Sequence, residues 1–347
     1  MKPLFHPVLV NGPFGDPGLY VDCLFEKRAL LFDLGDLRAL APRKLLRVSD
    51  AFVSHTHMDH FFGFDWLLRI CLAREHRMRL YGPPGFLAQV ESKLRAYTWN
   101  LVARYNTDFT FHATEVHGGV ARRARFRCQA AFRREGEHEL SFADGILLDE
   151  PAFRVRCTLL DHSTPCLGFA LEEKQHVNVW KSRLAALGWP TGPWLRELKH
   201  AVLAIEPDAT PFRVWWKAHG VMHEEWLPLG ELKRRMLEIV PGQKIAYVTD
   251  VVYHEENAAR IAALARGADF LFIESPFLDA EAERAAQKCH LTARQAGTVA
   301  RRAGVKAVIP FHFSPRYHER EAELRDEVAA AFAGAAAPTN DERAVTR

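Results

Sequence analysis

One stretch near the N-terminus, Ala51-Phe52-Val53-Ser54-His55-Thr56-His57-Met58-Asp59-His60, decides how the rest of the chain is interpreted. Its first three residues are apolar and typical of a short buried strand. The last six positions bring three imidazoles and a carboxylate together, and these groups suit a divalent cation such as Zn²⁺. Alternate residues in an extended turn face the same way. We therefore expect His55 and His57 to share one ion, and Asp59 and His60 to face a second.

Three later segments offer further ligands, and each directly follows a run that predicts a strand. They are Asp161-His162, Thr249-Asp250 and Phe311-His312. An α/β sheet gathers functional groups beyond the ends of its strands, so these side chains can meet the first cluster. An aspartate between two cations can bridge them, and Asp250 is the natural candidate. Any one segment alone would be unremarkable, but together the segments make a complete ligand set for two metals.

Hydrophobic periodicity along the chain indicates an α/β protein. Strands are expected at 19–25, 29–33, 51–53 and 78–85, throughout 108–160, and at 244–248, 270–273 and 307–310. Helices are expected at 61–75, 86–97, 255–266, 293–303 and 319–332. Residues 171–230, rich in Trp, Pro and Lys, are expected to be irregular. The segment 333–347 is expected to be a disordered C-terminal tail.

Composition places the chain among ordinary globular proteins. Of its 347 residues, 48% are hydrophobic and 26% are charged, and the net charge of +3 is too small to identify a partner. No apolar run approaches the roughly 18–20 residues that cross a bilayer. His6 and Pro7 interrupt the N-terminus too early for a signal-peptide core. The six cysteines form no C-x-x-C pair and are expected to be reduced thiols. We therefore expect a cytoplasmic protein with no membrane association.

The order and spacing of these motifs resemble the metallo-β-lactamase superfamily and, more closely, the ribonuclease Z family of zinc endonucleases that trim the 3′ end of precursor tRNA. The first motif alone would indicate only the superfamily. The closer likeness rests on His162-Ser163-Thr164-Pro165 with Gly168-Phe169, Phe272-Ile273-Glu274-Ser275-Pro276-Phe277, His290-Leu291-Thr292-Ala293, and Ile309-Pro310-Phe311-His312-Phe313-Ser314-Pro315-Arg316-Tyr317.

The resemblance covers about residues 20–317 and implies a fold. The expected architecture is the metallo-β-lactamase fold, an α/β four-layer αββα sandwich with a protruding arm insertion. The hydrolase domain would occupy residues 1–332, and the substrate-binding arm would be inserted at 172–200.

The resemblance also implies roles for the ligand set. The implied ligands are His55, His57 and His162 for one metal, Asp59, His60 and His312 for the other, and Asp250 as the bridge. The cofactors would be two divalent ions, with Zn²⁺ expected and Mn²⁺ or Fe²⁺ suiting the same donors. Water activated by the metals would attack phosphorus, and Asp59 would orient or deprotonate it. His290, held by Glu274, would protonate the leaving oxygen.

Substrate contacts are expected in two regions. The residues carried over from the family are Gly192, Pro193 and Lys199 in the arm, and Ser314, Arg316 and Tyr317 after the last metal ligand. For Arg316, a phosphate contact and a structural ion pair are equally open. The arginine run 122–134 and the basic and tryptophan residues of 180–200 could contact RNA. The alternatives are a solvated basic face for the arginines, and a small satellite core or a dimer contact for the aromatic residues. The family further implies a homodimer with precursor tRNA as its partner.

The likeness weakens at Asn11–Gly18, which replaces the Gly-Thr-Gly-containing turn of the family. A hydrolase of small phosphodiester, thioester or lactone substrates is therefore the alternative function. A non-catalytic RNA-binding or scaffold protein is a third hypothesis, and the intact ligand set argues against it. His219 and His223 have the spacing of a helical metal pair, although surface histidines are the expected interpretation.

Overall fold

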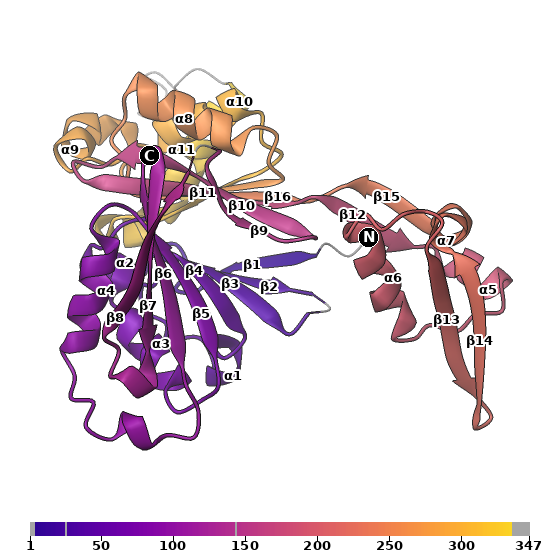
Figure 1. Ribbon diagram of the computed structural model, residues 1–347. Coiled ribbons are helices and arrows are strands. Elements are labelled where there is room, and N and C mark those ends of the chain that lie inside the picture. The colour runs from indigo at the N-terminus through magenta and orange to yellow at the C-terminus, as the bar shows by residue number, and fades with distance from the viewer. Residues whose placement is uncertain (1–3, 25, 143, 335–347) are drawn as a thin grey trace. The chain divides into compact units, whose positions relative to one another are not determined.

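The computed structural model describes residues 4–24, 26–142 and 144–334. The chain divides into two compact units (Figure 1). The larger takes in residues 5–147 and 156–170 and the chain from 244 onward, and the smaller consists mainly of 148–155 and 171–243. Of the predicted disordered tail, only Ala333 and Gly334 are described, and the rest lies outside the described residues.

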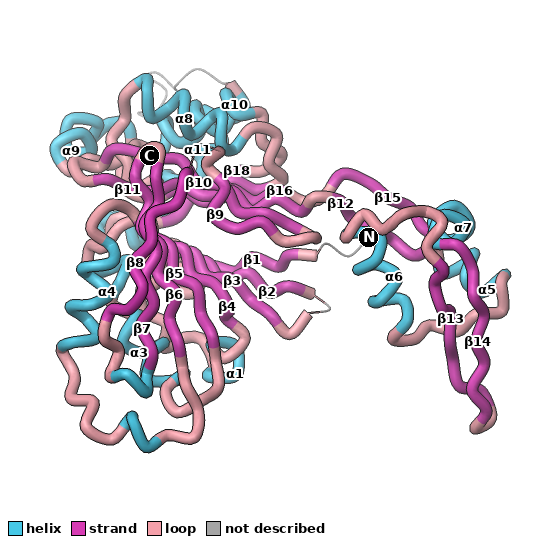
Figure 2. Tube along the Cα trace, in the orientation of Figure 1, coloured by secondary structure: helices cyan, strands magenta, loops and turns pink. Residues whose placement is uncertain are grey.

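An eight-stranded sheet forms the first half of the larger unit, with its strands in sequence order (Figure 2). They are β1 (Phe5–Leu9), β2 (Leu19–Cys23), β3 (Arg28–Phe32), β4 (Val48–Phe52), β5 (Arg77–Gly82), β6 (Thr110–His117), β7 (Val120–Arg127) and β8 (Arg134–Ser141). Strands β3 to β6 run parallel. Parallel neighbours need crossover connections. These carry the helices α1 (Pro42–Leu45), α2 (Met58–Phe61), α3 (Phe64–Cys71) and α4 (Phe86–Arg95) and the 3₁₀ turn η1 (Val102–Arg104), while η2 (Cys128–Ala130) follows β7.

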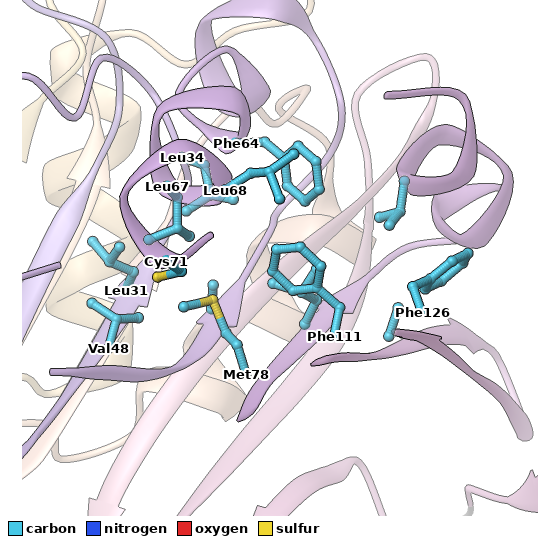
Figure 3. Close-up of a cluster of buried hydrophobic side chains, with 14 of the residues drawn as sticks. Leu31, Leu34, Val48, Phe64, Leu67, Leu68, Cys71, Met78, Phe111 and Phe126 are labelled. Carbon is cyan, nitrogen blue, oxygen red and sulfur yellow. The ribbon is translucent and has the colours of Figure 1, made fainter. Parts of the chain in front are cut away.

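The core of this half lies between the sheet and its helices (Figure 3). Leu67, Leu68 and Cys71 of α3 pack against Met78 of β5 and Phe111 of β6. Residues two apart in a strand share a face, which explains why alternate positions of β5 and β6 are apolar here. The opposite face turns toward the second sheet.

The helix expected over 61–75 exists but is shorter than predicted: it is α3, which begins at Phe64 and ends at Cys71, and Phe62–Gly63 separate it from the short helix α2. A Cβ at Gly63 would collide with the backbone oxygen of Gly35. The amide of Gly63 donates to Leu34 O at 2.7 Å, and the amide of Leu34 donates to His60 O at 2.9 Å. This close backbone approach interrupts the helix and ties the histidine motif to the end of β3.

A six-stranded sheet in the order β18-β17-β16-β11-β10-β9 forms the second half of the sandwich. Its strands are β9 (Ile146–Asp149), β10 (Phe153–Asp161), β11 (Pro165–Glu173), β16 (Lys244–Val248), β17 (Phe270–Glu274) and β18 (Val308–Phe311). The helical elements that follow are α8 (Glu255–Ala265), η3 (Asp279–Glu281), α9 (Ala282–Gln287), α10 (Ala293–Ala303), η4 (Pro315–Arg320) and α11 (Glu321–Ala333). Phe32 and Phe52 of the first sheet meet Phe169 of the second, with ring centroids 5.7 and 5.8 Å apart. The larger unit is therefore two sheets packed face to face with helices outside, as predicted.

The smaller unit contradicts the expectation that residues 171–230 are irregular. It contains β12 (Gln175–Val179), α5 (Lys181–Ala186), α6 (Trp194–Leu203), β13 (Pro211–Ala218), β14 (Val221–Pro228), α7 (Leu229–Met236) and β15 (Leu237–Pro241). The turn His219–Gly220 has positive φ at both residues, 48° and 83°, which matches the twist of a tight β-hairpin. His219 and His223 therefore lie on a hairpin, and a helical metal pair is excluded.

The predicted arm residues 172–200 lie within this unit, which continues to residue 243. Trp189 and Trp194 are buried in its core with Leu198 and Leu232. Their burial agrees with the satellite-core alternative for these aromatics and leaves them unable to stack on RNA bases.

Candidate metal centre

The ligand candidates of the sequence converge at one edge of the larger unit. His55, His57, His162 and Asp250 place one ligand atom each within 4.8 Å of one another. The same holds for Asp59, His60 and His312, and for a third group formed by Asp250, Glu274, His290 and His312. Most of these residues follow β4, β10, β16 or β18, whereas Glu274 is the last residue of β17 and His290 comes after α9. The structure thus gathers segments that lie as far apart as residues 55 and 312.

Asp250 lies at the centre of this arrangement. Its Oδ2 atom is 3.6 Å from His55 Nε2, 3.3 Å from His60 Nε2 and 3.4 Å from His162 Nε2. Its Oδ1 atom is 2.8 Å from His312 Nδ1. One buried carboxylate therefore faces imidazoles of both predicted ligand groups, which is the position a bridging ligand needs.

Asp59 occupies the more open side of the centre. Its Oδ2 atom lies 3.3 Å from His60 Nε2 and 3.4 Å from His312 Nε2, and 43% of its side chain is exposed. Asp59 and His60 belong to the single turn α2, which begins after His57. His57 is therefore in the extended segment before the helix, whereas Asp59 is in the first turn of the helix.

The donor set fits divalent cations. His55 Nε2, His60 Nε2 and His312 Nδ1 are buried and make no hydrogen bond, although each lies near the Asp250 carboxylate. A buried polar atom without a partner is costly, and a cation among these nitrogens would satisfy all of them. Burial and the neighbouring imidazole of His60 lower the pKa of His55 to about 2. The ring of His55 is therefore neutral, as a metal ligand must be.

The remaining charges point the same way. Burial lowers the pKa of His312, but Asp250 and Asp59 raise it by more, so that it stands well above its usual value. His60 behaves alike, with Asp250 and Asp33 outweighing its burial. The carboxylates therefore favour positive charge at this place, whether it comes from protons or from metal ions.

The backbone is strained where it presents the ligands. Asp250 and His312 have φ values of 45° and 58°, and Asp33 has 59°. Residues other than glycine seldom adopt positive φ, at a cost of about 1–3 kcal/mol each. Three such residues at one centre indicate that the surrounding packing holds these side chains in place.

Asp33 is a candidate functional residue that the sequence interpretation missed. It is fully buried at the end of β3 and accepts hydrogen bonds from Ser54 N at 2.6 Å and Tyr247 Oη at 2.9 Å. Its Oδ2 atom is 3.0 Å from His60 Nδ1. This contact orients the ring so that Nε2 faces the centre, which is the usual role of a carboxylate behind a metal-ligating histidine. The strand-end rule that identified Asp250 applies equally to Asp33.

The buried Glu274 pairs with the partly exposed His290 beside the ligands. Glu274 Oε2 lies 2.7 Å from His290 Nδ1, and Glu274 Oε1 accepts from the amides of Val251 at 2.9 Å and Leu291 at 3.1 Å. Burial raises the pKa of Glu274, but the neighbouring His290 outweighs this effect, and the pKa falls to about 2. In return, Glu274 outweighs the burial of His290 and raises the pKa of that imidazole. The pair favours a protonated His290.

A cavity of about 640 Å³ opens beside this pair. Asp59, His290 and His312 line it, as do Ser314 and Arg316. Arg316 also pairs with Glu281 at 2.6 Å. Tyr317 does not line the cavity, because its ring is buried and its hydroxyl bonds to the Glu281 carboxylate.

Two cationic side chains on the cavity wall were also missed. Arg284 and Lys288 line the cavity and are exposed. They are four residues apart at the end of α9, so they share a helix face. Two basic residues four apart, shortly before His290, could have indicated from the sequence a positively charged surface beside that histidine.

The remaining predicted substrate residues belong to the smaller unit. Pro193 precedes α6, and Gly192 packs closely on the ring of Trp194. Lys199 is half-buried, and burial lowers its pKa.

The arginine run is largely neutralised by acidic residues of β8. Arg125 and Arg127 pair with Glu135 at 3.1 and 3.0 Å. Arg134 lies 3.3 Å from Glu137. This pairing favours the solvated-face alternative for most of the run. Among the helices of the described residues, none has the length and apolar character needed to span a membrane.

Comparisons with known proteins agree with this geometry. A family model described as "Beta-lactamase superfamily domain" matches residues 235–313, which include Asp250 and His312. A protein named Ribonuclease Z from Deinococcus radiodurans is 32% identical over 330 residues, covering 94% of this chain and 94% of the relative.

Solved structures share the fold. Human tRNase Z, short form, superposes with a TM-score of 0.52 at 18% identity, covering 90% of this chain and 94% of that one. The metallo-β-lactamase fold protein YhfI from Bacillus subtilis gives a TM-score of 0.54 at 14% identity, covering 94% of both chains. The predicted fold class and family resemblance are both confirmed. The chain belongs to the ribonuclease Z family and is a metal-dependent hydrolase with the metallo-β-lactamase fold.

Proposed function

We propose that this protein is an endoribonuclease that removes the 3′ trailer of precursor tRNA. The observation that carries the proposal is the Glu274–His290 pair beside a complete metal-ligand set, in a chain that a ribonuclease Z matches along almost its full length. Ligands alone would fit any hydrolase of this fold. A positioned proton donor next to them fits a reaction whose leaving group is an alkoxide.

Two divalent ions, with Zn²⁺ preferred by this donor set, would be held by the residues of the two predicted groups. They are His55, His57 and His162 for one ion, Asp59, His60 and His312 for the other, and Asp250 for both. When bound, such ions lower the pKa of a water molecule and neutralise charge on a phosphate group.

The side chains would then divide the proton transfers between them. Asp59 is partly exposed at the cavity and would orient the attacking water or accept its proton. His290 uses Nδ1 for Glu274, which leaves Nε2 to donate a proton to the departing 3′ oxygen. Its raised pKa keeps that proton available near neutral pH.

The cavity wall would hold the RNA. Arg284 and Lys288 supply positive charge for phosphates, and the partly buried ring of Phe14 offers a surface for an unpaired base at the tRNA 3′ end. Ser314 and Arg316 would contact phosphate from the same wall.

Three further parts of the proposal rest on the family likeness. The residues 172–200 with Gly192, Pro193 and Lys199 would contact the body of the tRNA. The protein would act as a homodimer and reside in the cytoplasm. Light scattering on the purified protein tests the dimer, and a mass of one chain would reject it.

One observation favours a second function, the hydrolysis of small phosphodiester, thioester or lactone substrates. Phe14 and Asp16 line the cavity, and they belong to the segment 11–18 that departs from the family pattern. An altered loop at the cavity can change which substrate is accepted.

The deciding experiment is cleavage of a precursor tRNA with a short 3′ trailer by metal-loaded protein. We expect one cut after the discriminator base, abolished in His57→Ala and retained in His138→Ala, an exposed histidine on β8 that serves as matched control. Metal-loaded protein that leaves the RNA intact but hydrolyses bis(p-nitrophenyl) phosphate would establish the second function. Turnover by His57→Ala would reject the metal assignment.

A further inference from the structure

The face of the eight-stranded sheet that turns toward the second sheet carries aromatic side chains in its middle and cationic side chains nearer the start of β5. In its middle, Phe52 stacks on Phe32 and Tyr81 at centroid distances of 5.0 and 4.8 Å and meets Phe169 of the second sheet. Residues two apart share a face, so the positions before Tyr81 on β5 continue the same surface. Those positions are Arg79 and Arg77, and the surface therefore passes from aromatic to cationic.

Strand register extends this cationic surface sideways. Arg79 on β5 lies opposite His112 on β6, and Tyr81 lies opposite Thr114. Across the next pair, Thr114 lies opposite Arg123 on β7. Three strands thus bring together side chains that are separated by more than thirty residues in sequence.

These side chains enclose a cavity of about 350 Å³ that lies outside the metal centre. Arg77, Arg79, His112 and Arg123 line it with cationic or titratable groups. Ser49, Tyr81 and Thr114 complete the lining with hydroxyls. No carboxylate is among the lining residues of the described chain.

The positive charge in this cavity is only partly compensated. Asp50 is fully buried and pairs with Arg79 at 2.5 Å and with Arg28 at 2.7 Å. Arg123 donates to Thr114 Oγ1 at 3.3 Å, which is a neutral partner. Arg77 has no carboxylate partner within the part of the chain that the structure describes. The uncompensated charge is therefore that of Arg77 on β5 and Arg123 on β7.

His112 responds to this charge. Burial lowers its pKa, and Arg125, Arg123, Arg77 and Arg79 lower it further. An anion in the cavity would relieve the repulsion among these groups. Guanidinium groups bind phosphate oxygens through pairs of hydrogen bonds, and a hydroxyl can donate one more.

The cavity is distinct from the metal centre. Its lining residues include no member of the candidate ligand groups and none of the residues that line the cavity beside His290. The volume of the cavity is at the lower end of the range for small-molecule sites. A floor of buried Tyr81 and Thr114 between two arginines suits a compact phosphate group better than a continuous RNA backbone.

We propose that this cavity is a second ligand site that binds the phosphate group of a small phosphomonoester, with Arg77 and Arg123 as its principal contacts. His112 and Thr114 add hydrogen bonds to the same group, whereas the Ser49 hydroxyl donates to Asp50 Oδ2 at 2.5 Å. The inference does not depend on the identity of the RNA substrate, because none of these residues belongs to the metal centre.

Calorimetric titration of adenosine monophosphate into metal-loaded protein tests the proposal. We compare the wild type with the double variant R77Q/R123Q and with R122Q. Arg122 is the matched control because it neighbours Arg123 in β7 but points to the other face and pairs with Glu139 at 3.6 Å. Any nucleotide bound at the metal centre contributes equally in all three proteins. We expect at least tenfold weaker binding to the second site in R77Q/R123Q, and wild-type affinity in R122Q.

Two results would overturn the proposal. One is equal affinity for adenosine monophosphate in all three proteins. The other is an equally large loss of affinity for a single-stranded oligouridylate in R77Q/R123Q, which would make the cavity an RNA backbone contact. Unchanged oligouridylate binding supports the small-ligand site. Removing Arg77 breaks no described ion pair, so the single variant R77Q repeats the test if the double variant does not fold.

Discussion

Replacing Asp33 by asparagine tests whether a carboxylate behind the metal centre sets its geometry. Oδ1 of Asp33 accepts from Ser54 N at 2.6 Å, and an asparagine oxygen can keep that bond. Oδ2 faces Ser54 Oγ at 2.8 Å, Tyr247 Oη at 2.9 Å and His60 Nδ1 at 3.0 Å. In Asp33→Asn an NH₂ group would meet these three partners. The two hydroxyls can rotate and accept, but His60 Nδ1 must carry a proton if Nε2 is to bind metal.

The expected destabilisation follows from these hydrogen bonds. A hydrogen bond to a charged group contributes about 1.5–3 kcal/mol, and a buried unsatisfied donor costs a similar amount. Because the bond to His60 would be broken and the two hydroxyl bonds would be weakened, we expect Asp33→Asn to lower the free energy of unfolding by about 3–5 kcal/mol. Metal affinity should fall about 10–100-fold, as for other partners of metal ligands.

Urea unfolding of metal-free protein and metal titration against a competing chelator measure the two effects. Asp65→Asn is the matched control, because Asp65 forms a surface ion pair with Lys93 at 2.6 Å. We expect it to change stability by less than about 1 kcal/mol. The reasoning fails if Asp33→Asn unfolds like Asp65→Asn and binds metal as tightly as the wild type.

Three more predictions concern other parts of the larger unit. Lys288→Gln removes a charge from the cavity wall and should raise KM for precursor tRNA several-fold with little change in kcat, and an unchanged KM would remove Lys288 from the substrate site. Burial raises the pKa of Glu327, so the ionised carboxylate destabilises the fold as pH rises above its unfolded value. Glu327→Gln should therefore unfold at higher urea than the wild type at pH 8 but not at pH 4, and a gain at both would contradict this sign. Phe111→Ala leaves a void in a fully buried core and should cost about 3–5 kcal/mol in urea unfolding, whereas a cost below about 1 kcal/mol would mean that the core refills.

The sequence was most informative where chemistry and local pattern coincide. His55, His57, Asp59 and His60 lie within six residues after an apolar run, so their proximity could be predicted without the fold. Asp250 was found because it ends a clear strand.

Residues brought together only by tertiary structure were not predictable in the same way. Asp33 follows a strand as Asp250 does, but its hydrogen-bond donor Tyr247 lies more than two hundred residues later in the sequence. Arg77, His112 and Arg123 meet through strand register, which local periodicity does not encode.

The smaller unit shows a different limit. Its helices α5 and α7 are short, and its hairpin β13–β14 exposes most residues of β14 on both faces. Without a buried face, alternation of apolar and polar residues is lost. The only local sequence feature that pointed to a hairpin was Gly220, which occupies a positive-φ position of the turn.

The candidate ligands of the metal centre are spread along the chain from residue 55 to residue 312, so they are synthesised at different times. The strands β1 to β8 leave the ribosome before any of β16 to β18 has been synthesised. At the usual pace of translation, roughly 10–50 seconds separate the emergence of His60 from that of His312. During that interval the first histidines have neither Asp250 nor His312 beside them. The last ligand lies close to the end of the sandwich, so a truncated or stalled chain cannot assemble the centre. Under the proposed ligand assignment, hydrolysis can therefore begin only after the entire sandwich has been made.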